Sequence, residues 1–226
     1  MRKLCLVFLC AVTMTGLFAG DVASFVNLGF SSDGTRFVFG QYGVTDVNFQ
    51  AYADIFCVDV PQNKFFTDGK KTIQPTRSTA GKDAKGVFAS LQNDTAAYIK
   101  KLGVDSSNLG RTIYIQAVDE PKLKQISFRD FETGITYEVA LKVLSEGSKE
   151  NVKSSFYLTV EMLGLDGTKT VKTIGLPGFK REGINDYLIR RIITDSSGKS
   201  LVFIIEKSQF EPNGNSIRFM VETLRL

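Results

Sequence analysis

Few residues of this chain combine the types and the spacing that catalysis requires. Ser196 and Lys199 have the Ser-x-x-Lys spacing of a serine nucleophile with its lysine base. Both lie in a stretch of Asp, Ser and Gly that is typical of a tight turn, and no second motif of this enzyme class accompanies them. We therefore interpret them as turn residues and predict no catalytic residue from the sequence.

Oxygen-bearing side chains that could bind calcium gather in a loop that we expect over residues 40–54. Asp46, Asn48 and Asp54 offer the hard ligands that Ca²⁺ prefers, but the alternate-residue spacing with a closing Glu is missing. The sequence therefore predicts neither a metal nor another cofactor. We expect these three side chains to lie in solvent, on a loop that is the candidate surface for binding a partner.

Two further groups of charged residues could take part in catalysis or binding, but they could also be ordinary surface residues. Glu182 and Asp186 could serve as acid and base of a carboxylate-dependent hydrolase if the fold placed them about 5 to 9 Å apart. Charged turn residues also explain them. The basic pairs at 180–181 and 190–191 are interpreted as solvated faces of strands.

The composition excludes several classes of site. The chain of 226 residues has no histidine, which excludes imidazole triads, zinc sites with histidine ligands and imidazole pH switches. It has no tryptophan either, and its 18 Phe and 7 Tyr favour a packed interior over an indole cage for a sugar or a quaternary ammonium group.

The first 20 residues have the pattern of a cleaved signal peptide. Two basic residues precede an uncharged, mostly apolar run over 4–18, which is shorter than the roughly 20 residues that span a bilayer, and small residues follow. An uncleaved anchor is the alternative. Cleavage removes two of the 28 basic residues and none of the 24 acidic ones, which leaves 26 against 24, a net charge of +2. We expect a periplasmic or secreted protein with no membrane span and no nucleic acid as partner.

Cys57 is the only thiol that remains after this cleavage, because Cys5 and Cys10 belong to the signal. An intramolecular disulfide is then impossible. The residue lies inside the apolar run 55–58, so we predict a buried core cysteine, with an intermolecular link as the alternative.

The apolar pattern predicts a mainly β chain. Alternating or continuous apolar runs bounded by Gly, Asn, Asp or Ser are typical of strands. Such runs occur at 25–30, 37–42, 54–60, 112–115, 126–131, 135–144, 155–163, 170–176, 188–194, 201–206 and 217–224. The clearest hairpin covers 158–174, with its turn at Asp166 and Gly167.

One region breaks this pattern. Over residues 82–102 apolar residues recur every three or four positions, and Gly103 follows where a helix ends, so we predict one surface helix there. The polar flank over 62–85 is expected to be an exposed connection. No further linker divides the chain, and we expect residues 21–226 to form a single β-rich domain.

An internal echo links the two ends of the chain. Residues 31–39 reappear 164 positions later, and each copy predicts a strand, a tight turn of Ser, Asp and Gly, and a second strand. We therefore expect equivalent turns at Gly34 and Gly198 and equivalent buried positions for Phe39 and Phe203. The two ends of the chain should then lie in neighbouring sheets.

The turn followed by an aromatic-ended strand resembles the blade unit of Tol-type β-propellers. Blades need about 40 to 45 residues, so a chain of this length could hold four or five of them. The resemblance implies an irregular or propeller-like β-sheet domain, and a β-sandwich is the alternative.

A second resemblance covers the whole chain. It rests on the segments LGFSSDG (28–34), QYGV (41–44), YADIF (52–56), YLIRR (187–191) and IRFMVET (217–223), together with the signal-like N-terminus. In these the chain resembles the bacterial "predicted secreted protein" family of unknown function. The resemblance implies export and a β pattern at both ends, and it transfers no catalytic residue.

Two functional classes remain open. The first is a non-enzymatic periplasmic binding or interaction module whose partner is a macromolecule of the envelope, expected to be a protein. The second is a carboxylate-dependent hydrolase of the envelope. A cluster of acids in a deep pocket would favour the hydrolase, whereas a broad face or an exposed apolar edge would favour the binding module.

Overall fold

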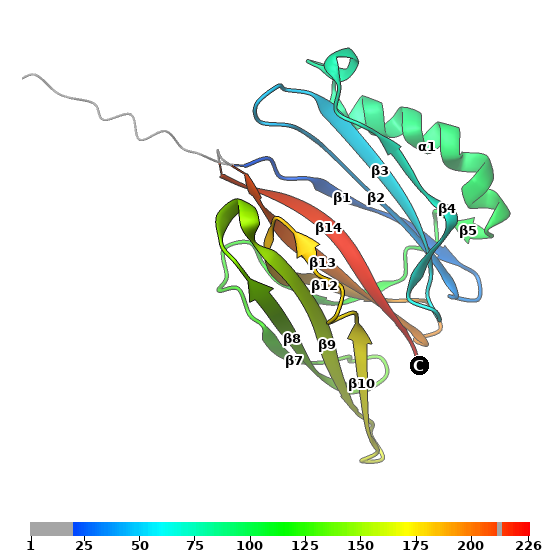
Figure 1. The fold of residues 1–226 in the computed structure, drawn as a ribbon. Helices are drawn as coiled ribbons and strands as arrows, with labels where there is room; N and C mark the ends of the chain where they lie inside the picture. Colours follow the sequence, from blue (N-terminus) through cyan, green and yellow to red (C-terminus); the bar gives the residue numbers. More distant parts are fainter. Residues whose placement is uncertain (1–19, 212–213) are drawn as a thin grey trace, which may run out of the picture.

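The computed structural model describes residues 20–211 and 214–226, and it shows three antiparallel sheets stacked as layers with one helix on the outside (Figure 1). The predicted signal peptide lies outside the described residues except for Gly20. The mainly β prediction is confirmed, and the stacked layers correspond to the sandwich alternative. The propeller-like arrangement is not confirmed, because these sheets pack face to face.

The helix-side sheet has the strand order β4-β3-β2-β1-β5. Its strands are β1 (Ser24–Ser31), β2 (Arg36–Val44), β3 (Ala51–Asp59), β4 (Lys64–Ile73) and β5 (Val104–Asp105). The expectation of an exposed connection over 62–85 is therefore wrong, since β4 occupies much of it.

Helix α1 (Ala84–Lys101) confirms the helix predicted over 82–102. Asp83 begins it by accepting hydrogen bonds from the backbone N–H groups of Lys85 and Gly86. Its apolar side packs on the outer face of the helix-side sheet, where Cys57 is buried. Burial raises the pKa of the Cys57 thiol to about 11, so the thiol stays protonated at neutral pH. Cys57 is thus the buried core cysteine that the sequence predicts.

The central sheet has the order β14-β13-β12-β6. Its strands are β6 (Arg111–Ile115), β12 (Ile184–Thr194), β13 (Ser200–Glu211) and β14 (Gly214–Arg225). Both faces are covered, which explains the continuous apolar run of β13. Phe203 and Ile205 pack against the outer sheet, and Ile204 packs against the helix-side sheet.

The outer sheet has the order β10-β9-β8-β7, and β11 pairs with β9. Its strands are β7 (Gln125–Arg129), β8 (Thr136–Glu146), β9 (Lys153–Leu163), β10 (Lys169–Gly175) and β11 (Arg181–Glu182). Tyr137 and Val139 are buried whereas Glu138 between them is exposed, as expected for a sheet with one face in solvent. The β9–β10 hairpin confirms the one predicted over 158–174.

The echoed turns are equivalent in the structure. Gly34 and Gly198 have φ values of 68° and 70°, a left-handed conformation that favours glycine. Phe39 and Phe203 are both fully buried. The turns also touch, because the Ser200 hydroxyl donates to the Gly34 carbonyl at 2.7 Å. The two ends of the chain therefore lie in neighbouring sheets, as predicted.

Candidate functional site: a cationic cleft along strand β14

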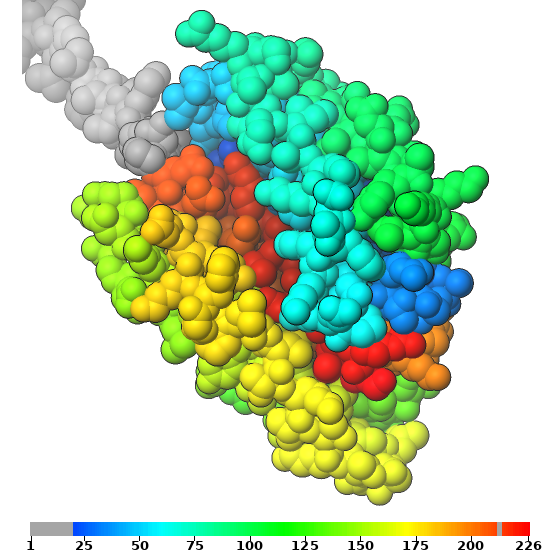
Figure 2. All heavy atoms as spheres, turned by 45° about the vertical axis from the view of Figure 1, so that its right-hand side comes forward, coloured from blue at the N-terminus to red at the C-terminus, as the bar shows by residue number. Residues whose placement is uncertain are grey.

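A cleft of about 550 Å³ opens beside β14, the edge strand of the central sheet. One wall comes from β2, β3 and β4 of the helix-side sheet, and the other comes from the connection between β10 and β11. Figure 2 shows red β14 at the bottom of a hollow between cyan β4 and the yellow segment that includes β10. The volume is within the range of sites for small molecules, about 300 to 1,000 Å³.

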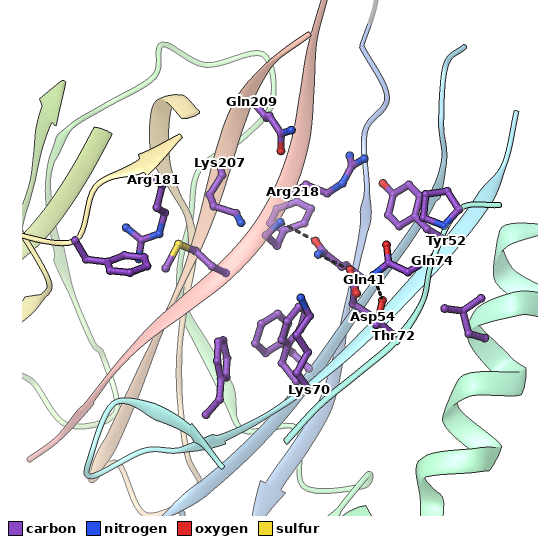
Figure 3. Close-up of a pocket in the computed structure, with 18 residues that line it drawn as sticks. Gln41, Tyr52, Asp54, Lys70, Thr72, Gln74, Arg181, Lys207, Gln209 and Arg218 are labelled. Carbon is purple, nitrogen blue, oxygen red and sulfur yellow. Dashed lines mark hydrogen bonds between the residues drawn. The ribbon is translucent and has the colours of Figure 1, made fainter. Parts of the chain in front are cut away.

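Four cationic side chains from four strands line this cleft: Lys70 (β4), Arg181 (β11), Lys207 (β13) and Arg218 (β14). Lys207 and Arg218 are cross-strand partners in the register of β13 and β14. Figure 3 shows Lys207 and Arg181 on one side of β14, and Gln41 and Asp54 on the other.

Arg218 has a carboxylate partner. It makes two hydrogen bonds to Asp21, one of them from Nη2 to Oδ2 at 3.0 Å, and its guanidinium lies 4.3 Å from the ring centre of Tyr52. Asp21 thus binds the edge of the guanidinium, and the Tyr52 ring covers one of its faces. Arg218 is held in place, and its charge is largely compensated.

Arg181 is held by aromatic rings, and it has no ion pair with a carboxylate of the described residues. Its guanidinium carbon lies 5.3 Å from the ring centre of Phe156 and 5.1 Å from that of Phe179. Its Nη1 atom is buried and has no hydrogen-bond partner among residues 20–211 and 214–226. A buried donor without a partner is unfavourable, so this group has capacity for an acceptor from a ligand.

Lys207 is the second uncompensated cation. Within the described part of the chain, its ammonium makes no hydrogen bond and no ion pair. Burial lowers its pKa to about 8, and the positive charges of Arg181, Arg218 and Lys70 contribute to the shift. An anion bound between Lys207 and Arg181 would relieve both the desolvation and the repulsion.

Gln41 fixes the polar side of the cleft. Its Nε2 donates to Asp54 Oδ2 at 3.1 Å, and its Oε1 accepts from the backbone N–H of Phe219 at 2.7 Å. The side chain therefore connects β3 to the edge of β14. This connection fixes the distance between the helix-side and central sheets where the cleft opens.

Aromatic side chains stand at both rims. Phe65 on β4 is 49% exposed and Phe179 on the opposite wall is 57% exposed, although both line the cleft. Phe56 packs against Phe65 with ring centres 5.4 Å apart, and Lys70 lies 5.7 Å from the ring centre of Phe56. The cleft thus offers apolar surface beside its positive charge.

The structure separates the three residues of the candidate partner-binding loop. Asp46 and Asn48 lie in the short connection 45–50 between β2 and β3. Asp54 lies within β3 and lines the cleft. Among the residues that the structure describes, no group of His, Cys, Asp and Glu could hold a metal ion.

The prediction of a long loop over 40–54 is wrong, because β2 extends to Val44 and β3 begins at Ala51. Gly40 and Gly43 belong to β2. A Cβ on Gly40 would collide with the ring of Phe88 from α1, and a Cβ on Gly43 would collide with the side chain of Tyr52. Glycine in a strand can mark such a close approach, and here it allows aromatic side chains to cover the sheet.

The other residues considered for chemistry have ordinary partners or positions. Glu182 pairs with Lys153 at 2.8 Å, and Asp186 pairs with Lys124 at 2.5 Å. Ser196 lies in the turn between β12 and β13, as predicted. Each of the two acids is therefore paired with a lysine, which agrees with the interpretation of charged turn residues.

The sequence predictions missed the cations of the cleft, although a signal for one of them was present. Side chains two residues apart in a strand share a face, so Lys207 is in phase with the core residues Phe203 and Ile205. A lysine that continues an apolar face indicates a site. The sequence predicts Arg181 in solvent, whereas in the structure it is half-buried against the rings of Phe156 and Phe179.

Comparison with known proteins gives a family without an activity. No curated protein and no solved structure matches the chain. Over the described residues, no helix combines the length and apolar character needed to cross a membrane. A family model described as "Predicted secreted protein (DUF2259)" matches residues 38–225, which include β3, β4 and the cleft strands β11, β13 and β14. The chain therefore belongs to this family of predicted secreted proteins.

Proposed function

We propose that this protein is a non-enzymatic binding protein of the periplasm that takes an anionic ligand in the cleft beside β14. The observation that carries the proposal is the convergence of Arg181 and Lys207, two cations with no carboxylate partner among the described residues, on one cleft. Both side chains are partly buried, and partly buried charge without an ionic partner destabilises a fold and is typical of functional sites. An anionic ligand supplies the missing partner.

The size and lining of the cleft favour a small ligand over the alternatives. A hydrolase that uses two carboxylates would need a second acid beside Asp54, and the described lining of the cleft contains only that one. A macromolecular partner at the connection that carries Asp46 and Asn48 stays a prediction from the sequence. The cleft offers charge and apolar surface together, which supports ligand binding more directly.

We also propose that the protein is exported. The family is described as one of predicted secreted proteins, and the first 20 residues have the pattern of a signal peptide. We propose that these residues direct export and are cleaved, and that residues 21–226 form one domain that carries the cleft.

A fluorescent aromatic monoanion, 1-anilinonaphthalene-8-sulfonate, tests whether the cleft binds anions. The wild-type protein is expected to bind it with fluorescence enhancement, and Lys207→Met should weaken the affinity about tenfold, corresponding to loss of one charge-assisted contact. The matched control is Lys142→Met, because Lys142 is exposed on β8 of the outer sheet, outside the cleft lining.

The control should bind the probe as tightly as the wild type. Equal affinities for the wild type, Lys207→Met and Lys142→Met would show that the probe binds elsewhere, and the proposed function would then be wrong. Circular dichroism of all three proteins verifies that the fold is retained.

A further inference from the structure

The charges of the cleft indicate how much negative charge its ligand carries. Of the four cations that line it, Arg218 is paired with Asp21 and Lys70 is exposed to solvent. The partly buried Arg181 and Lys207 have no ion pair, and Glu222 is the further carboxylate whose charge acts on Arg181. Two positive charges, those of Arg181 and Lys207, therefore lack a directly paired carboxylate among the described residues. A ligand group with two negative charges would neutralise them, whereas a monoanion would leave one partly buried charge unpaired.

The donors approach from different walls, which indicates the shape of the ligand group. Lys207 projects from β13 in the central sheet, and Arg181 projects from β11, which pairs with β9 of the outer sheet. Lys70 approaches from β4 on the opposite wall. A carboxylate offers two oxygens in one plane, whereas a phosphate monoester offers three terminal oxygens in a tetrahedral arrangement that donors from several directions can reach.

The rims indicate what the phosphate is attached to. Phe65 and Phe179 are large, exposed and on opposite walls of the same cleft. Exposed aromatic rings at a cleft stabilise flat apolar groups by stacking or edge contacts. A ligand with its charge at Lys207 and Arg181 and a flat group toward the rims would use both features.

We propose that the ligand is a phosphate monoester attached to a flat apolar group. The proposal rests on the proposed anion-binding function and makes it more specific. Arg181 and Lys207 bind the terminal phosphate oxygens, and Phe65 and Phe179 contact the apolar group.

Isothermal titration calorimetry with phenyl phosphate and phenyl sulfate at about pH 7.5 tests the charge. The two probes share their shape, but the phosphate ester is largely a dianion at this pH because its second pKa is about 6, and the sulfate ester is a monoanion. We expect phenyl phosphate to bind at least about tenfold more tightly. Arg181→Gln should reduce that ratio by about tenfold, and Lys142→Met should leave it unchanged.

Two further arms test the apolar group and the source of the phosphate. Phenyl phosphate should bind more tightly than inorganic phosphate, because only the ester reaches the aromatic rims. It should also bind more tightly than dihexanoyl phosphatidic acid, whose phosphate monoester is attached to a lipid. Tighter binding of the lipid, or equal binding of inorganic phosphate, would overturn the flat apolar group.

Equal affinity for the sulfate and phosphate esters would overturn the double charge. If neither ester binds while the fluorescent sulfonate still does so in a Lys207-dependent way, the phosphate class is wrong and the anionic cleft remains. If the sulfonate also fails to depend on Lys207, the proposed function itself fails. Lys207→Met and Arg181→Gln serve as independent variants in case one of them does not fold.

Discussion

Replacing Lys207 with methionine is expected to stabilise the folded protein by roughly 2 kcal/mol near pH 7 and to raise Tm by roughly 4 to 8 °C. Methionine fills much of the space of the lysine stem without carrying a charge. The lowered pKa of Lys207, about 8, shows that the fold disfavours the protonated ammonium because of burial and of the neighbouring cations. The size of the effect is discounted for partial solvent exposure of the side chain.

The stabilisation should depend on pH in a defined direction. In the unfolded chain Lys207 titrates near the ordinary lysine value of 10.5, and in the folded protein its pKa is about 8. Between these values the unfolded state binds more protons, so the wild-type protein gains stability as pH rises from about 8 to about 10.5. The advantage of Lys207→Met is therefore fully present below about pH 8 and disappears above about pH 10.5.

Urea unfolding at several pH values measures this difference. Lys142→Met, on an exposed position of β8, is the control and should change the free energy of unfolding by less than about 0.5 kcal/mol. Destabilisation by Lys207→Met at pH 7 would contradict the account, because it would mean that the ammonium has a favourable partner in the folded protein.

The second large effect concerns the central sheet. Phe203→Ala and Ile204→Ala should each destabilise the protein, by about 3 to 5 and about 2 to 5 kcal/mol respectively. The two residues are adjacent on β13 and point to opposite faces, and both are buried because the outer and helix-side sheets cover both sides. Urea unfolding monitored by circular dichroism gives both values.

A one-sided strand provides the matched comparison. Glu138 follows the buried Tyr137 on β8 but points away from the core, so Glu138→Ala should change the free energy of unfolding by less than about 0.5 kcal/mol. If either Phe203→Ala or Ile204→Ala were equally harmless, one face of the central sheet would be exposed and the stacking of three layers would be wrong.

Strands whose apolar residues form the core could be predicted from the sequence, and β4 shows why others could not. β4 reads KFFTDGKKTI, and Gly69 is its only buried residue. An edge strand buries so little that neither alternation nor a continuous apolar run is present. Because β4 was expected to be a connection, Lys70 could not be assigned to a wall of the cleft.

The candidate site was harder to predict than the core because its members are distant in the sequence. Arg181 follows Lys180 in a polar stretch, and only the folded protein shows that it is half-buried against the rings of Phe156 and Phe179. The sequence predicts Asp54 in a loop, whereas the structure places it in β3, from which it lines the cleft. Local patterns predict which residues enter the core, whereas a site between sheets depends on how the sheets stack.

Direct titration of Lys207 by NMR tests the central claim, which is that the cleft holds an uncompensated cation ready for an anionic ligand. Selective ¹³Cε labelling of lysine, with Lys207→Met to assign the signal, gives the pKa of this ammonium with and without phenyl phosphate. We predict a midpoint near 8 in the free protein and a clear rise in the presence of the ligand, since an anion favours the protonated form. A midpoint at the ordinary lysine value of about 10.5 that does not respond to phenyl phosphate would contradict the account.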